Sequence, residues 1–127
     1  LRKLHPENPV AMHPRDAERL GVRDGDEVEI ATPGGSARAT VRVRTGVMPG
    51  VVAVEHGYGH RELGARAHAV GDRKQPVRPE LAAVINLNDL GLSDPTRSGA
   101  AVWLDPVCGS AVRNGLPARV TRSTANA

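Results

Sequence analysis

The sequence has no phenylalanine, and aromatic residues make up only 2% of its 127 positions. Large aromatic side chains therefore cannot carry the packing of the core, which has to be built from valine, alanine, leucine and isoleucine. Such methyl-rich side chains favour β-structure. Because compact domains commonly have this length, we expect residues 1–127 to form a single domain.

Cysteine is nearly absent, since Cys108 is the only one. A lone cysteine excludes a disulfide within the chain and any zinc or iron–sulfur site built from several of its own cysteines. The surrounding segment, DPVCGSAV at 105–112, resembles a short metal-binding motif of copper-handling proteins, but it lacks the aromatic pattern that follows that motif. We therefore expect Cys108 to be a small, buried hydrophobic residue.

Long apolar runs are also missing, so no direct insertion into a membrane is expected. The chain carries a small excess of positive charge, with 17 Lys and Arg against 14 Asp and Glu. A positive excess favours anionic partners such as phosphate or nucleotide. The arginines are scattered, however, and a solvated basic surface accounts for them, so no nucleic-acid partner is predicted. A cytoplasmic and a periplasmic or other extracytoplasmic location both remain open.

Turn signals separate short periodic segments along the chain. His13 can cap a helix that begins at Pro14, and Gly21 can end it in a left-handed conformation. Several segments alternate apolar and polar residues as half-buried strands do, and a PGG turn at 33–35 separates two of them. The polar segment 66–80 has no usable period and predicts a surface excursion. A short extended run opens the segment that starts at Asn8, and a strand with alternating Val28 and Ile30 follows the Asp24–Gly25 turn within 22–32. Further strands are predicted at 37–44, 51–56 and 116–123, so the fold class is mainly β with short helices.

The segment VAVEHGYGHRELG at 52–64 places glycines around the only tyrosine. Gly57 and Gly59 allow backbone N–H groups to approach phosphate oxygens closely, which a Cβ would obstruct. Tyr58 offers a flat face and a hydroxyl group, and His60 can donate to an oxygen. The alternative is a plain β-turn with a packed tyrosine, which is the better interpretation of these residues in isolation.

Four pieces in order resemble one known family: NP at 8–9, P..A..LG..DGD.V from Pro14, G.GH from Gly57, and N.N.L followed by D and SG from Asn86. Over residues 5–122 the sequence is similar to the C-terminal molybdopterin-dinucleotide-binding domain of the dimethyl sulfoxide reductase superfamily. The details are closest to its tetrathionate, thiosulfate, polysulfide and arsenate reductases. The resemblance implies a six-stranded double-psi β-barrel that closes over bis(molybdopterin guanine dinucleotide).

On this resemblance, the loop at 57–60 lies against pterin or pyrophosphate. Asn86 and Asn88 match an Asn-containing segment near the cofactor, and Asp89 is a further candidate. Amide and carboxylate groups suit the donors and acceptors of a guanine edge. The alternative is that these residues cap a helix or turn; we prefer contact for Asn86 and leave both open for Asp89. Ser98, in the SG turn, is a candidate neighbour of phosphate or pterin.

The resemblance further implies a domain that is not catalytic by itself, so no catalytic or metal-ligating residue is assigned. It would orient the cofactor of a molybdenum or tungsten oxidoreductase, for example one of the tetrathionate or thiosulfate type. Other domains would hold the metal, and the full enzyme would carry an iron–sulfur cluster that this chain lacks. The implied partners are an iron–sulfur electron-transfer subunit and the remaining domains of the catalytic subunit.

Two other interpretations of the sequence remain open. The chain could be a free-standing double-psi barrel that serves as a small subunit, as in formylmethanofuran dehydrogenases. It could also be a barrel used for protein or nucleic-acid interaction, as in the N-domains of some ATPases. The GYGH and INLNDL segments favour cofactor binding over both. No Ser–His–Asp or paired-carboxylate arrangement is legible in the sequence.

Overall fold

The computed structural model describes residues 4–59, 69–78, 84–94, 96, 98, 102–112 and 114–123. This part of the chain is mainly β, with one short α-helix and one 3-10 helix, as the sequence predicts. The elements are, in order, β1 (Val10–Met12), α1 (Pro14–Leu20), β2 (Glu27–Thr32), β3 (Gly35–Val43), β4 (Val52–Ala53), β5 (Ala69–Val70), β6 (Arg73–Lys74), η2 (Leu87–Leu90) and β7 (Arg119–Arg122).

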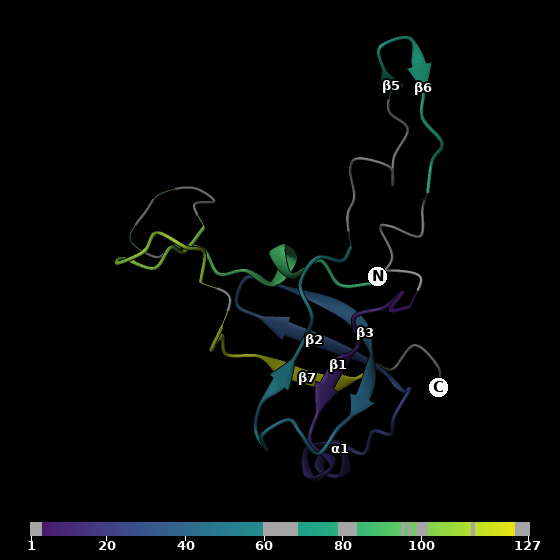
Figure 1. Ribbon diagram of the computed structural model, residues 1–127. Coiled ribbons are helices and arrows are strands. Elements are labelled where there is room, and N and C mark those ends of the chain that lie inside the picture. Colours follow the sequence, from purple (N-terminus) through teal and green to yellow (C-terminus); the bar gives the residue numbers. More distant parts are fainter. Residues whose placement is uncertain are drawn as a thin grey trace.

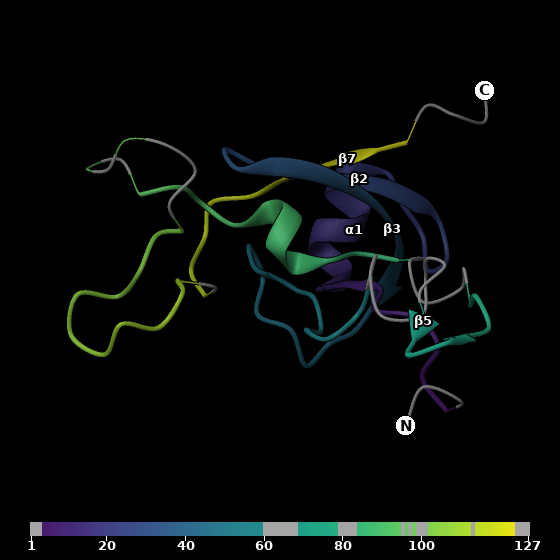
Figure 2. The same ribbon diagram turned by 90° about the horizontal axis from the view of Figure 1, so that it is seen from above.

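Five strands form one curled sheet in the order β4-β1-β3-β2-β7, and β5 pairs separately with β6 (Figure 1). Strands β1 and β3 are parallel, whereas the other pairs in the sheet are antiparallel. Figure 1 shows α1 at one end of the curled sheet and η2 at the other. Seen from above in Figure 2, the sheet curves around the side on which η2 lies.

The β2–β3 hairpin is the longest paired unit of the sheet. Thr32 pairs with Gly35, so Pro33 and Gly34 form the two-residue turn that the PGG segment predicts. Along β2, Val28 and Ile30 are buried and alternate with exposed glutamates. The core is built from small aliphatic side chains as expected, with one methionine: Val10, Met12, Ala17, Val22, Val28, Ile30, Val41, Ile85 and Leu90.

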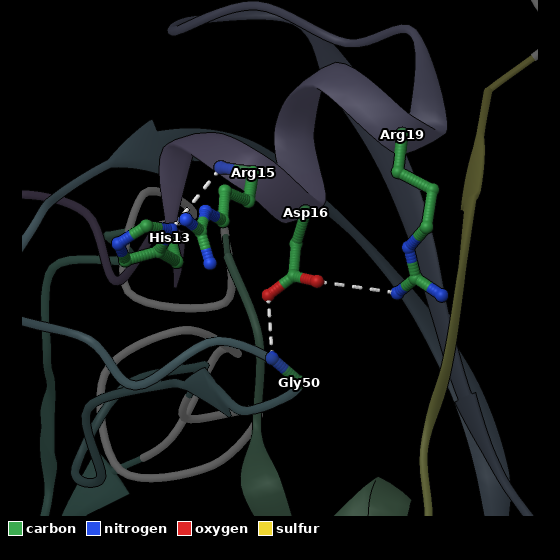
Figure 3. Close-up of polar contacts among 5 residues, drawn as sticks. All are labelled: His13, Arg15, Asp16, Arg19 and Gly50. Atoms are coloured by element: carbon green, nitrogen blue, oxygen red, sulfur yellow. Dashed lines mark hydrogen bonds and ion pairs between the residues drawn. The ribbon is translucent and has the colours of Figure 1, made fainter.

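Helix α1 has the termini that the sequence predicts. His13 is the N-cap, and its Nδ1 accepts a hydrogen bond from the Arg15 backbone N–H at 3.1 Å (Figure 3). Gly21 ends the helix with φ 67°, and its N–H donates to the carbonyls of Ala17 and Glu18. The buried face of the helix carries Ala17 into the core.

Asp16 of α1 also ties the helix to the turn that precedes β4. Its Oδ2 accepts the backbone N–H of Gly50 at 2.7 Å, and its Oδ1 pairs with the Arg19 guanidinium at 3.2 Å (Figure 3). The Arg19 side chain is 72% exposed, whereas that of Asp16 is only 13% exposed. The bond to Gly50 joins segments 34 residues apart, whereas the pair with Arg19 lies within the helix.

Replacing Asp16 with alanine is expected to lower the free energy of unfolding by about 1–2 kcal/mol, because it removes a charge-assisted hydrogen bond to a backbone donor. Urea unfolding followed by circular dichroism measures this difference. Arg19→Ala is the matched control, and it should cost less than about 0.5 kcal/mol because an exposed ion pair contributes little. Equal losses in the two variants would contradict the importance assigned to the Gly50 bond.

Two expectations from the sequence need correction in detail. Strand β4 ends at Ala53 rather than continuing to residue 56, and beyond it the Glu55 carbonyl accepts a hydrogen bond from the Asn8 side chain. The predicted excursion at 66–80 contains the β5–β6 hairpin, whose four strand residues are all exposed and turn at Gly71. Two-residue strands are too short to produce a readable period. Residues 66–68 and 79–80 lie outside the described residues.

The prediction that Cys108 is buried is wrong, because the side chain is exposed. It lies in a surface turn closed by Asp105, whose Oδ1 accepts the backbone N–H groups of Cys108 and Val107, both at 2.9 Å. These bonds stabilise the carboxylate, so Cys108 first and then Val107 lower the pKa of Asp105 below its ordinary value. The turn is built around an acceptor rather than around an apolar contact.

Among the described residues, no helix is long and apolar enough to cross a membrane.

Candidate functional site

The two segments singled out in the sequence meet in the structure. The side-chain Nδ2 of Asn86 donates to the carbonyl oxygen of Gly59 at 3.2 Å. Gly59 is buried and has φ 67°, and a Cβ built on it would lie 2.5 Å from the backbone nitrogen of Asn86. In Figure 1 the segment after β4 and the segment that leads into η2 run side by side. Gly59 and Asn86, which are 27 positions apart in the sequence, are therefore in direct contact.

Asn86 has a structural function in this contact. Its Oδ1 accepts the backbone N–H of Asn88 at 3.0 Å, which makes it the N-cap of η2. The capping interpretation is therefore confirmed for Asn86, whose amide nitrogen and oxygen each have a partner within the protein. Asn88 is exposed and Asp89 is half-buried in the first turn of η2.

Three of the remaining candidates, Gly57, Tyr58 and Ser98, lie among the described residues. The hydroxyl group of Tyr58 donates to the backbone carbonyl of His5 at 2.9 Å, so it fastens the glycine loop to the N-terminal segment. Gly57 is exposed, with φ 94°, and a Cβ at this residue would have no heavy atom within 4 Å. Ser98 is exposed on the segment after η2, and His60 lies outside the described residues.

Asn8 belongs to the same arrangement, although the sequence reasoning did not assign it to the site. It is 1% exposed, and its Nδ2 donates to the carbonyls of Glu55 and Ile85, both at 2.9 Å. Its Oδ1 accepts the Ile85 N–H at 3.0 Å. Residue 55 precedes the glycine loop and residue 85 precedes Asn86, so one side chain touches both segments. The available signal was the NP pair at 8–9, which the sequence showed only as part of the resemblance.

The tip of the β2–β3 hairpin supports the other end of η2. Thr32 Oγ1 donates to the carbonyl of Leu90 at 2.6 Å. A Cβ on Gly34 would overlap the carbonyl oxygen of Gly91, and a Cβ on Gly35 would overlap that of Asp89. Two backbones therefore approach each other at a distance that only glycine allows.

A separate cavity of about 880 Å³ lies in the described part of the chain. Leu87 and Leu90 line it, whereas none of the predicted site residues that the structure describes does. We place the candidate site at the meeting segments rather than in this cavity, because backbone amides and amide side chains gather at the former. The other lining residues include Met12, Asp16, Arg19, Leu20, Ile30, Thr32, Val52, Val54, Leu116, Arg119 and Val120.

The described residues hold no group of three or more His, Cys, Asp or Glu side chains that could bind a metal ion. What the site offers instead is a pair of glycines with positive φ and two polar side chains at the start of η2. Such groups can accommodate phosphate oxygens and the edge of a base.

Curated relatives are similar to nearly the whole chain. A tetrathionate reductase subunit of Salmonella typhimurium is 52% identical over 122 residues, which are 96% of this chain and 12% of the relative. The arsenate respiratory reductase molybdopterin-containing subunit of Chrysiogenes arsenatis is 31% identical over 88% of this chain and 12% of its own length. The chain thus spans about one eighth of the length of these two relatives.

A solved structure and a family model complete the comparison. Acetylene hydratase from Pelobacter acetylenicus covers 96% of this chain and 15% of its own, with a TM-score of 0.66 and 21% identity, which shows a shared fold. The family model described as "Molydopterin dinucleotide binding domain" matches residues 1–96, about three quarters of the chain. The chain therefore belongs to the molybdopterin dinucleotide binding domain family.

Proposed function

We propose that this chain binds and orients the guanine dinucleotide and pterin part of a bis(molybdopterin guanine dinucleotide) cofactor. The observation that carries the proposal is the contact of Gly59 with Asn86, which joins the two segments expected to touch the cofactor. The family match supports dinucleotide binding, and the 52% identity to a tetrathionate reductase subunit supports an oxidoreductase of that type.

The residues of the site fit such a ligand. At Gly57 there is open space where a side chain would be, so a phosphate or pterin can approach the backbone. Asn88 and Asp89 present an amide and a carboxylate at the start of η2, and we assign them to the guanine edge. Because Asn86 already caps the helix, its contribution is to shape the loop as well as to contact the base. Tyr58, His60 and Ser98 remain proposed neighbours of pterin or phosphate.

In the larger protein, other domains would hold molybdenum or tungsten and an iron–sulfur cluster, and a separate iron–sulfur subunit would exchange electrons. The cofactor would supply two-electron chemistry with transfer of an oxygen or sulfur atom at its metal. This chain would supply binding and orientation, with no catalytic residue of its own. We further propose that its curled five-stranded sheet is part of a six-stranded double-psi barrel.

Titration with GDP tests the proposal in solution. Because this chain offers only part of the contact surface, binding should be weak, about −4 to −6 kcal/mol. GDP should shift the amide resonances of Gly57 to Gly59 and of Asn86 to Asp89 together. Asn88→Ala should reduce the preference for GDP over ADP roughly fivefold, since one hydrogen bond to the base is lost.

Arg42→Ala is the matched surface control, because Arg42 is exposed and pairs only with Asp24 among the described salt bridges. It should leave the GDP preference unchanged. If saturating GDP moves neither segment, while exposed arginines shift and recover with added salt, simple counterion attraction is the better account and the proposed site is wrong.

A further inference from the structure

Asn8 lies between the two segments of the proposed site and touches the backbone of both. Its amide oxygen and nitrogen bind the N–H and C=O of Ile85, a two-bond pairing like that between neighbouring strands. The same nitrogen donates to the carbonyl of Glu55. Only one side chain is involved, yet residues 47 and 77 positions away are fixed relative to it.

The environment of Asn8 makes these bonds hard to replace. Its side chain is essentially inaccessible to water, and Ile85 is also buried, at 1% exposure. A backbone N–H or C=O left without a partner there would not be rescued by solvent. Among the described residues, no buried side-chain nitrogen or oxygen lacks a partner, so the amide is fully used.

The neighbouring contacts depend on the position that Asn8 sets. Ile85 is followed by Asn86, which caps η2 and bonds to Gly59, and Glu55 lies four residues before Gly59. Tyr58 adds a bond from the same loop to His5, but that bond is at an exposed position. Asn8 is therefore the buried member of the connection between the N-terminal segment and the two loops.

We propose that Asn8 is the positioning residue of the dinucleotide site: it couples residues 55–59 and 85–89 into one unit without touching the ligand. The part of this inference that concerns ligand binding rests on the proposed function, whereas the coupling itself is a property of the chain. Without Asn8 the two segments separate from each other while the β2–β3 hairpin keeps its pairing.

Native-state amide exchange of Asn8→Ala tests the coupling. Protection at Ile85, Asn88 and Asp89, whose N–H groups bond to Asn8 or Asn86, should fall at least roughly tenfold more than protection in β2 and β3. Asn8→Asp is the second variant, because it keeps the shape and the acceptor for the Ile85 N–H but cannot donate to two carbonyls when ionised. It should show the same selective loss.

Asp16→Ala is the matched control, since it also removes a bond between a side chain and a distant backbone N–H, but at the opposite end of the sheet. In Asp16→Ala, the protection of residues 55–59 and 85–89 should keep the same ratio to the protection of β2 and β3 as in the natural sequence. If Asn8→Ala and Asn8→Asp lower protection uniformly along the chain, Asn8 is an ordinary stabilising residue and the inference is overturned.

GDP binding separates this inference from the proposed function. If the natural sequence binds GDP, Asn8→Ala should weaken binding at least roughly fivefold, and Asp16→Ala should not. Unchanged affinity in Asn8→Ala would overturn the positioning of the ligand site. If the natural sequence does not bind GDP, the proposed function fails, and the exchange result alone decides whether Asn8 couples the two segments.

Discussion

Replacing Gly59 with alanine is expected to lower the free energy of unfolding by about 2–5 kcal/mol. The backbone at Gly59 has φ 67°, which costs other residues about 1–2 kcal/mol. The new Cβ would also lie 2.5 Å from the nitrogen and 2.9 Å from the Cα of Asn86, and such overpacking costs about 1–3 kcal/mol. These two backbone atoms cannot move away from the new Cβ, because Asn86 is fixed as the N-cap of η2.

Two other glycines serve as matched controls for this substitution in denaturant unfolding. Gly57 has φ 94° but open space around its Cβ position, so Gly57→Ala should cost only the strain of about 1–2 kcal/mol. Gly46 has open space and no positive φ, so Gly46→Ala should change stability by about 0.5 kcal/mol or less. If Gly59→Ala costs no more than Gly57→Ala, the close contact with Asn86 is not rigid.

The sequence predicts those elements whose causes are local. The N-cap at His13, the stop at Gly21 and the two-residue turn at Pro33 and Gly34 follow from the chemistry of single residues, and all three are confirmed. Alternation along β2 also predicts correctly that Val28 and Ile30 are buried. These signals are readable because each needs only a few neighbours along the chain.

Long-range contacts could not be predicted in the same way. The bond from Asn8 to the Glu55 carbonyl joins positions that are 47 residues apart, and the local sequence does not indicate it. The contact of Asn86 with Gly59 appears only in the structure, and the use of Asn86 as a cap could not be separated from ligand contact by sequence alone. Cys108 lies exposed in a turn whose backbone N–H groups bond to Asp105, an arrangement that composition does not reveal.

The segment 85–91 is held at three places: by Asn8 at its start, by Gly59 beside it and by the hairpin tip at its end. The hairpin tip is the support that belongs to the rigid sheet. Since β2 and β3 are paired along six residue positions, the tip cannot move away from η2 without breaking part of this strand pairing. We therefore expect the placement of η2 to depend on the absence of side chains at the tip.

Replacing Gly34 with alanine should consequently destabilise the fold by about 2–4 kcal/mol. The new Cβ would overlap the carbonyl oxygen of Gly91 and lie 3.2 Å from that of Leu90, so either the turn or the end of η2 has to move. Movement would also stretch the bond from Thr32 to Leu90. Urea unfolding gives the loss, and amide shifts should concentrate at residues 87–92 rather than in α1.

Thr32→Val separates crowding from hydrogen bonding, because it removes the hydroxyl donor and keeps the shape of the side chain. It should cost about 1–2 kcal/mol and shift the same residues by less than Gly34→Ala does. If Gly34→Ala instead shifts only the hairpin and leaves residues 87–92 unchanged, the turn yields and η2 does not depend on it. If the amide resonances of the hairpin and of residues 87–92 both shift in Gly34→Ala, the sheet sets the position of the polar groups at the start of η2. It then also sets the position of the proposed dinucleotide site.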